Sequence, residues 1–389
     1  MIVKNEAANL PSCLSSVSGV VDEIVIVDTG STDRTLEIAR EFGARIYEFE
    51  WCNDFAVARN QSLKYVQGEW ILVLDADEVL VPEIVPNLKQ AIKHSGYLLV
   101  NLVRQEIGAA QSPYSLVSRL FRNHPDIYFS RPYHALIDDS VSSILSQEPQ
   151  WRIGYLPEVA VLHSGYQKST LLSANKFSKA QAAMEGFLAS HPNDPYVCSK
   201  LGALYVQTGS AARGIELLER GLTSNGTNAT VLYELHYHLG IAYTRLQHSL
   251  AIAHYEAALQ MDIYPMLKLG AYNNLGNLRR ADGDLTAAQT LYKRALQIDP
   301  TFAAGHYNLG ITLKALGYLK DAIAAYQRAI QLNPTYAEAY QNLGVVFLKL
   351  GQVPQSLAAF GSALALHEQQ NPDEAKRLRQ GLKEMGFQP

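Results

Sequence analysis

The stretch WILVLDADE, residues 70–78, joins an apolar run to three carboxylates. The run 70–74 predicts a buried strand, and side chains two residues apart in an extended chain point the same way. We therefore expect Asp75 and Asp77 at one edge of a sheet. Two carboxylates at the carboxyl end of a strand can hold a divalent metal ion that carries a phosphorylated ligand. The alternative is a strand followed by a solvated acidic turn, and this stretch alone does not decide between them.

The composition excludes several classes of protein. A chain of 389 residues predicts two or more domains, and 48% hydrophobic with 18% charged residues is typical of a soluble globular protein. A net charge of −4 argues against a nucleic-acid partner. Three scattered cysteines without a CxxC pair indicate neither a zinc site nor a disulfide framework and fit a reducing compartment. No apolar run approaches the roughly 18 residues of a membrane span, and residues 1–6 lack the apolar core of a secretion signal. We therefore expect a cytoplasmic protein without a transmembrane segment.

The first 165 residues or so alternate β-rich runs with helical patterns. Ser31 is a plausible N-cap for the first of these helices after a strand, and Gly43 lies just past its end. Alternation of this kind is typical of an α/β domain with a mostly parallel sheet. The predicted strands are 23–27, 45–49, 70–74 and 97–103, and the predicted helices are 32–42 and 53–66.

The second half has a different period, because glycines, aromatics and alanines recur 34 residues apart. A unit of 34 residues with a small residue at the helix crossing and an aromatic in its second helix is typical of the tetratricopeptide repeat (TPR). We expect about five repeats in an all-α solenoid over 195–368, a helical connector over 168–194 and a capping helix or tail over 369–389. The recurring positions are Gly276, Gly310 and Gly344; Gly283, Gly317 and Gly351; Tyr292, Tyr326 and Phe360; and Ala295, Ala329 and Ala363.

Four patches in the first half carry residues suited to chemistry. Residues 28–33 follow a strand and open a helix, where backbone N–H groups favour an anion, although simple helix capping is the alternative. Arg59 offers a guanidinium for a phosphate or base. His134 and His163 could each join an aspartate around Mn²⁺ or Mg²⁺, although a lone histidine is more often structural. The chain has no HExxH, Gly-x-Ser-x-Gly or Walker motif, which argues against hydrolase triads and P-loop phosphotransfer.

Taken in order and spacing, the segments 1–6, 27–33, 58–60 and 74–78 resemble the family 2 glycosyltransferases of the GT-A fold. The closest resemblance is to a bacterial subgroup in which TPR repeats follow the catalytic domain. It covers roughly residues 1–165, and the stretches beginning at Arg119 and His163 also look like segments of that subgroup. The resemblance implies a GT-A nucleotide-sugar-binding domain, Rossmann-like, over 1–167.

The family also implies roles for single residues. Asp28 would hold the base of a nucleotide-sugar, Arg59 would contact the nucleotide, and Asp75 would lie against the ribose and metal. Asp77 would bind Mn²⁺ or Mg²⁺, and His163 would be a further metal or diphosphate contact. The implied nucleotide-sugar set is Asn5, Glu6, Asp28, Arg59 and Asp75, and the implied metal set is Asp77, Asp75 and His163.

Three departures from the family pattern stand out. The chain begins inside the expected first strand, so we expect either a start upstream of Met1 or a shortened strand. Thr29 stands where many relatives carry a second aspartate. His134 is followed by Ala135 where relatives often show His-Glu, which leaves the general base of an inverting transfer unassigned. The weak candidates for that base are Asp138, Asp139 and His134, with Asp126 also nearby.

These patterns together predict a metal-dependent inverting glycosyltransferase with a nucleotide-sugar donor, a UDP-linked one being favoured. The acceptor is open among a saccharide, a lipid-linked molecule and a protein, and the repeats would bind a protein partner or the acceptor. Asn274, Asn308 and Asn342 would line the inner face of the repeats and contact a ligand backbone. The main alternative is a non-catalytic TPR scaffold with a degenerate GT-A domain. Nucleotidyl transfer is less favoured, because the glycine-rich, lysine-bearing loop of such enzymes is absent.

Overall fold

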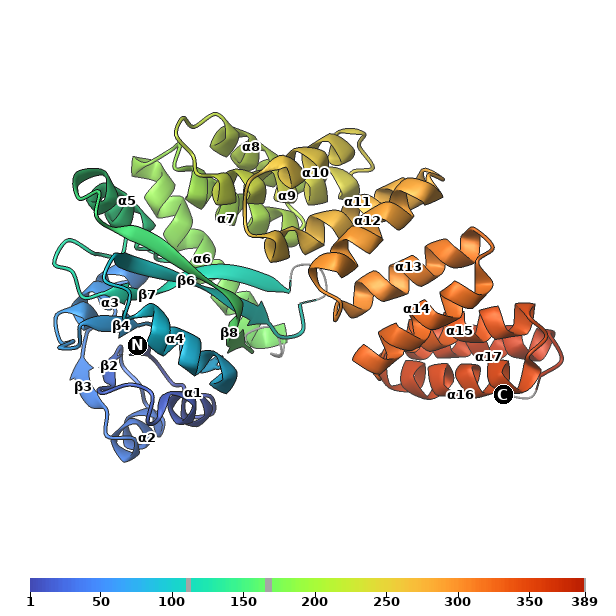
Figure 1. Ribbon diagram of the computed structural model, residues 1–389, viewed down its shortest axis with the longest axis horizontal. Coiled ribbons are helices and arrows are strands. Elements are labelled where there is room, and N and C mark those ends of the chain that lie inside the picture. Colours follow the sequence, from blue (N-terminus) through green and yellow to red (C-terminus); the bar gives the residue numbers. More distant parts are fainter. Residues whose placement is uncertain (110–112, 165–169, 388–389) are drawn as a thin grey trace. The chain divides into compact units, whose positions relative to one another are not determined.

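The computed structural model describes residues 1–109, 113–164 and 170–387, with side chains from residue 177 onward in the last range. The chain divides into two compact units, Met1–Thr227 and Asn228–Pro389. The division lies inside the segment 195–368 that the sequence assigns to the repeats. Figure 1 labels the elements of both units along the chain. None of the helices in the described ranges is both long and apolar enough to cross a membrane.

The first unit begins with a parallel three-stranded sheet in the order β1-β2-β3. The segments predicted as strands at 23–27 and 45–49 both contribute to it. The helix between them begins at Thr35 rather than at Thr32, so the prediction that Ser31 caps it is wrong. The Ser31 hydroxyl instead donates to Asp28. The elements are β1 (Ile2–Val3), α1 (Leu10–Val17), β2 (Val25–Asp28), α2 (Thr35–Glu41), β3 (Arg45–Glu48) and α3 (Phe55–Leu63).

A second sheet of five strands, in the order β4-β7-β6-β8-β5, is mixed. β6 and β8 run parallel, whereas β4–β7, β6–β7 and β5–β8 are antiparallel. The α/β fold class is confirmed, but parallel strands predominate only in the first sheet, because β6 and β7 follow one another closely and adjacent strands with a short connection pair antiparallel. The elements are β4 (Trp70–Leu72), β5 (Glu78–Leu80), α4 (Val85–Ala91), β6 (Tyr97–Glu106), β7 (Tyr114–Arg122), α5 (Asp138–Gln147) and β8 (Arg152–His163).

The acidic turn after β4 is anchored in the cores of both sheets. Ala76 packs in the apolar cluster that contains Val3 and Ile26 of the first sheet. Leu74 packs in the cluster that contains Leu102 and Leu120 of the second sheet. Burying a leucine side chain stabilises a fold by about 1.5–3 kcal/mol. The two buried neighbours therefore fix where Asp75 and Asp77 emerge.

Helices make up most of the rest of the chain over the residues that the structure describes. The 34-residue period follows from their packing, since a Cβ added at Gly276 would lie 2.6 Å from the Tyr292 ring, and at Gly310 2.7 Å from the Tyr326 ring. At these two positions a glycine lets the helices of the repeat cross over that ring. The elements are α6 (Thr170–Ser190), α7 (Pro195–Gln207) and α8 (Ala211–Leu222) in the first unit, and α9 (Ala229–Arg245), α10 (Leu250–Gln260), α11 (Leu269–Ala281), α12 (Leu285–Ile298), α13 (Ala303–Ala315), α14 (Leu319–Leu332), α15 (Ala337–Lys349), α16 (Val353–Gln370) and α17 (Pro372–Glu384) in the second.

Two of the three recurring asparagines are buried between the helices of the repeats. Asn274 and Asn308 are buried. The Asn274 amide donates to the Tyr255 hydroxyl, and the Asn308 amide donates to Asn273 Oδ1 at 2.7 Å. These two asparagines join neighbouring helices to each other, and their contact with a ligand backbone stays a prediction. Asn342 is partly exposed and accepts a hydrogen bond from Lys314 Nζ at 2.6 Å.

Candidate active site

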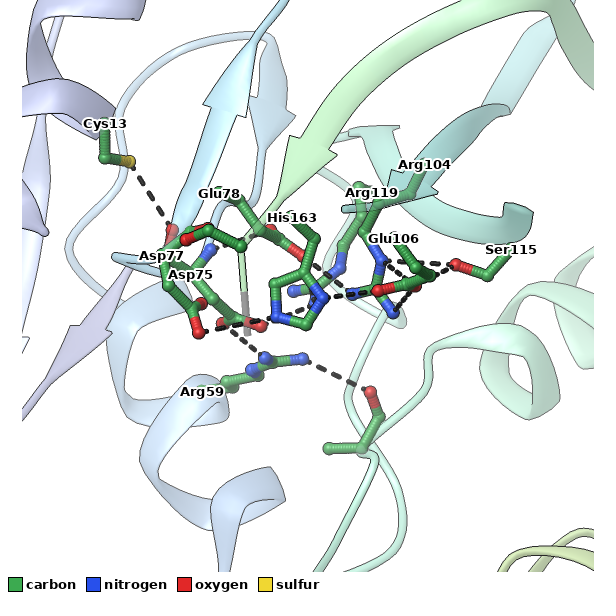
Figure 2. Close-up of polar contacts among 12 residues, drawn as sticks. Cys13, Arg59, Asp75, Asp77, Glu78, Arg104, Glu106, Ser115, Arg119 and His163 are labelled. Carbon is green, nitrogen blue, oxygen red and sulfur yellow. Dashed lines mark hydrogen bonds and ion pairs between the residues drawn. The ribbon is translucent and has the colours of Figure 1, made fainter. Parts of the chain in front are cut away.

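The acidic motif forms a turn rather than the end of an extended strand. β4 ends at Leu72, and the Glu78 N–H donates to the Asp75 carbonyl at 3.0 Å. A hydrogen bond across four residues closes a β-turn, in which side chains two apart need not point the same way. The prediction that Asp75 and Asp77 share one direction is therefore wrong. Figure 2 shows their carboxylates turned to different partners.

Asp75 is held by two arginines. Its Oδ1 accepts from Arg59 Nη2 at 2.7 Å and its Oδ2 accepts from Arg119 Nη2 at 2.8 Å. Its backbone N–H donates to Glu78 Oε2 at 2.8 Å. Burial acts to raise the pKa of Asp75, but the guanidinium groups of Arg119 and Arg59 outweigh it and hold that pKa well below its ordinary value. Asp75 is therefore a fixed anion with both carboxylate oxygens in use.

Asp77 faces His163, the last residue of β8. Asp77 Oδ2 lies 3.4 Å from His163 Nε2, and His163 Nδ1 donates to Glu106 Oε2 at 2.5 Å. Burial acts to lower the pKa of His163, but its hydrogen bonds to the two carboxylates raise the pKa to about 9. The predicted pairing of Asp77 with His163 in one site thus has a geometric basis (Figure 2).

Arg104 joins the two halves of the site. Its guanidinium contacts Glu78 Oε1 at 2.7 Å and Glu106 Oε1 at 2.7 Å. Burial acts to raise the pKa of Glu106, but hydrogen bonds from His163 and Ser115 and the charge of Arg104 lower it to about 2. We call Arg59, Asp75, Asp77, Glu78, Arg104, Glu106, Ser115, Arg119 and His163 the site network.

Sequence reasoning missed the contribution of β6 and β7 to this network. Glu78 and Arg119 lie in segments that the family resemblance covers, but neither had a role, and Arg104 and Glu106 had no motif at all. A signal was available, since Arg104 and Glu106 are two apart at the end of a strand that is mostly apolar up to Val103, and so share one face. Buried charges in such a place require partners.

The residues predicted for the nucleotide form a second group at the ends of β1 and β2. Asp28 is 4% exposed, and its Oδ2 accepts from the N–H groups of Gly30 and Ser31, both at 3.0 Å. Asn5 Oδ1 accepts from the Thr32 N–H at 2.7 Å. The carboxylate of Glu6 accepts from the Asn9 amide. Asn5 and Asp28 thus order one loop. Arg59, which was also predicted to contact the nucleotide, lies instead in the site network through its contact with Asp75.

The three candidates for the general base lie on α5 and the loop before it. Asp139 is engaged by Arg131 Nη1 at 2.5 Å. Asp138 Oδ1 accepts from the Ser118 hydroxyl at 3.1 Å, while its buried Oδ2 makes no hydrogen bond to the part of the chain that the structure describes. Burial, with a smaller effect of the Asp139 carboxylate, raises the pKa of Asp138. His134 is exposed, with a backbone φ of 51°.

The possible metal ligands around Asp77 fit a divalent ion that takes further ligands from a bound substrate. Over residues 1–109, 113–164 and 170–387, no group of three or more His, Cys, Asp and Glu side chains could hold a metal by itself. Asp77 and His163 supply one oxygen and one nitrogen, and Mg²⁺-type sites commonly take their other ligands from phosphate and water. His163 donates its Nδ1–H to Glu106, so its Nε2 faces Asp77. Many metal-binding histidines likewise donate one ring N–H to a carboxylate and bind the metal through the other nitrogen. Asp75 fits less well than Asp77 as a direct ligand, because each of its oxygens already accepts a hydrogen bond from an arginine.

Comparisons with known proteins identify the family of this chain. The family model for glycosyl transferase family 2 matches residues 1–154, and the TPR repeat model matches residues 276–317 and 312–351. A TPR repeat-containing protein of Synechococcus elongatus is 44% identical over 302 residues, which cover 77% of this chain and 75% of that protein. This chain belongs to glycosyl transferase family 2. It is a glycosyltransferase with C-terminal TPR repeats.

A more distant relative is named a glycosyltransferase. The glycosyltransferase SunS of Bacillus subtilis is 26% identical over 199 residues, which cover 50% of this glycosyltransferase and 46% of SunS. This chain thus matches about half the length of that relative. Among solved structures, the TPR protein YrrB is 18% identical with a TM-score of 0.42, over 53% of this chain and 100% of its own. A MamA structure is 20% identical with a TM-score of 0.37, over 45% of this chain and 92% of its own.

Proposed function

We propose that this glycosyltransferase moves a sugar from a nucleotide diphosphate-sugar to an acceptor hydroxyl with inversion, and that it works with Mn²⁺ or Mg²⁺. The observation that carries the proposal is the approach of Asp77 to His163 at 3.4 Å beside the arginine-bound Asp75. A carboxylate and an imidazole supported from behind are suitable ligands for such an ion. The ion, when bound, would stabilise the charge that develops on the leaving diphosphate.

The residues of the chain divide the remaining work. Asp77 and His163 would hold the diphosphate end of the donor through the ion. Asp75 would border the ribose as a rigid anion, since Arg59 and Arg119 fix both its oxygens. The loop that Asn5 and Asp28 order at the ends of β1 and β2 would border the base, because ligands of parallel sheets bind at the carboxyl ends of the strands.

We assign the general base to Asp138 among the three candidates. A raised pKa brings a carboxyl closer to the pH at which it can accept a proton, which favours a base. Asp139 is less suited, because its carboxylate is already paired with the Arg131 guanidinium. His134 stays a weaker candidate on the same loop.

The donor, partner and compartment follow from the same proposal. UDP is the nucleotide to test first, and the acceptor is a saccharide, a lipid-linked molecule or a protein. The repeats would bind a protein partner or the acceptor, as TPR arrays bind peptides on their concave face. We place the reaction in the cytoplasm, because Cys13, Cys52 and Cys198 are all free thiols.

Calorimetry with UDP and Mn²⁺ tests the donor site. We expect the full chain to bind UDP only weakly without the metal and about 10-fold more tightly, or better, with it, because Asp77 and His163 would hold the ion and the ion would attract the diphosphate. Asp77→Ala should remove that gain. Asp22→Ala, the same change at an exposed aspartate of the first unit, should leave it unchanged. A wild-type chain that shows no metal-dependent UDP binding contradicts the proposal and favours the scaffold alternative.

A further inference from the structure

The strand register places three functional side chains in one row across the second sheet. His163 on β8 is paired with Glu78 on the antiparallel strand β5 and with Glu106 on the parallel strand β6. Residues paired across neighbouring strands lie side by side on the same face. The row explains why Glu106, which no motif marks, reaches the histidine beside the acidic turn (Figure 2).

The carboxylate of Glu106 has a fixed orientation. Its Oε1 accepts from the Ser115 hydroxyl at 2.7 Å and from Arg104 Nε at 2.8 Å. The side chain is 7% exposed, so water cannot easily replace these donors. Because Oε1 is occupied twice, Oε2 is the oxygen presented to His163 Nδ1, at 2.5 Å.

We propose that Glu106 is a positioning residue for the donor site, and that the β6–β7 hairpin sets the metal affinity through it. By accepting the Nδ1–H of His163, Glu106 fixes the ring plane and directs Nε2 at Asp77. A histidine whose other nitrogen is held in this way loses less freedom when it binds a metal. This inference rests on the proposed function, because it concerns the ion that Asp77 and His163 would hold.

Arg104 extends the same control to the other aspartate. It binds Glu106 and also Glu78, whose other oxygen accepts the Asp75 N–H. The turn and the histidine are therefore tied to one guanidinium on β6. Buried ion pairs carry a desolvation penalty that apolar residues would avoid. The need to orient Asp77 and His163 explains why charged residues stand here despite that penalty.

Mn²⁺ titration in the presence of UDP tests the inference on the full chain. We expect Glu106→Ala to weaken Mn²⁺ affinity by about 10–100-fold, with metal-free UDP affinity unchanged. Glu106→Gln keeps an oxygen acceptor for Nδ1–H and should recover most of the affinity. Glu185→Ala is the matched control, since Glu185 also accepts side-chain hydrogen bonds, from Tyr205 and Arg213, but on α6. It should leave Mn²⁺ affinity unchanged.

Histidine-labelled NMR of the metal-free chain gives a second readout. The Nδ1–H of His163 should give an exchange-protected signal that Glu106→Ala abolishes and Glu185→Ala retains. A folded Glu106→Ala variant with wild-type Mn²⁺ affinity overturns the inference and leaves the proposed function standing. A wild-type chain without Mn²⁺-dependent UDP binding overturns both.

Discussion

Asp75 and Asp77 are two residues apart, yet their contacts give them different tasks. Asp75 neutralises Arg59 and Arg119, whose side chains are about one-tenth exposed (11% and 10%). Asp77 faces His163 and is the residue that the proposed ion would need. On the proposed function, Asp75 would chiefly stabilise the fold around the donor, whereas Asp77 would bind the ion directly. This difference can be measured, because the two losses should appear in different experiments.

Asp75→Ala should cost far more stability than Asp77→Ala. Removing one partner of a buried ion pair costs about 3–5 kcal/mol, and we expect a loss near the lower figure because the Asp75 side chain is 33% exposed. Urea unfolding of both variants measures the difference. Asp22→Ala serves again as the exposed control. Equal losses for Asp75→Ala and Asp77→Ala would contradict the division of tasks.

The three cysteines should differ in reactivity. Burial, with a contribution from the Glu78 carboxylate, raises the pKa of the Cys13 thiol to about 12, whereas Cys52 is exposed. Cys198 is also buried. Because the thiolate is the reactive form, a thiol reagent at pH 8 should modify Cys52 rapidly in the native chain and all three after denaturation. Mass spectrometry identifies the modified residues. Cys13 Sγ donates to the Asp75 carbonyl at 3.5 Å, so rapid native labelling of Cys13 would show that the turn at Asp75 opens readily.

At the scale of elements, local patterns predicted what depends on local spacing. The strands at 23–27 and 45–49 and the 34-residue repeat were evident, because hydrophobic runs and the crossing glycines repeat at fixed intervals. The site network was not, because it depends on the pairing of β5, β8 and β6, which are far apart in sequence. His163 was predicted to join Asp77, but its support by Glu106 required the register of the sheet.

Alanine substitutions at two glycines separate packing from helix propensity. Gly276→Ala would place a Cβ 2.6 Å from the Tyr292 ring, so we expect a loss of about 1–3 kcal/mol. Gly361, inside α16, has nothing within 4 Å of such a Cβ. Gly361→Ala should be neutral or stabilising by up to about 1 kcal/mol. Chemical unfolding followed by circular dichroism gives both values, and a stable Gly276→Ala would contradict the crossing contact.

At the scale of the molecule, the two compact units meet between Thr227 and Asn228 in sequence. The site network lies wholly in the first unit, and the crossings of Gly276, Gly310 and Gly344 lie in the second. Multidomain chains commonly unfold in more than one step. We therefore expect two calorimetric transitions, each of which responds to changes in its own unit.

UDP with Mn²⁺ should raise one transition and leave the other in place. A ligand at 100 times its Kd stabilises the state that binds it by about 2.7 kcal/mol, and the proposed ligands would contact the first unit. Gly310→Ala should lower the other transition, because its Cβ would lie 2.7 Å from the Tyr326 ring. When the variant is combined with the ligands, the temperature difference between the two transitions should change by the sum of both shifts. A single transition that responds to both changes would show instead that the donor site and the repeats unfold as one cooperative body.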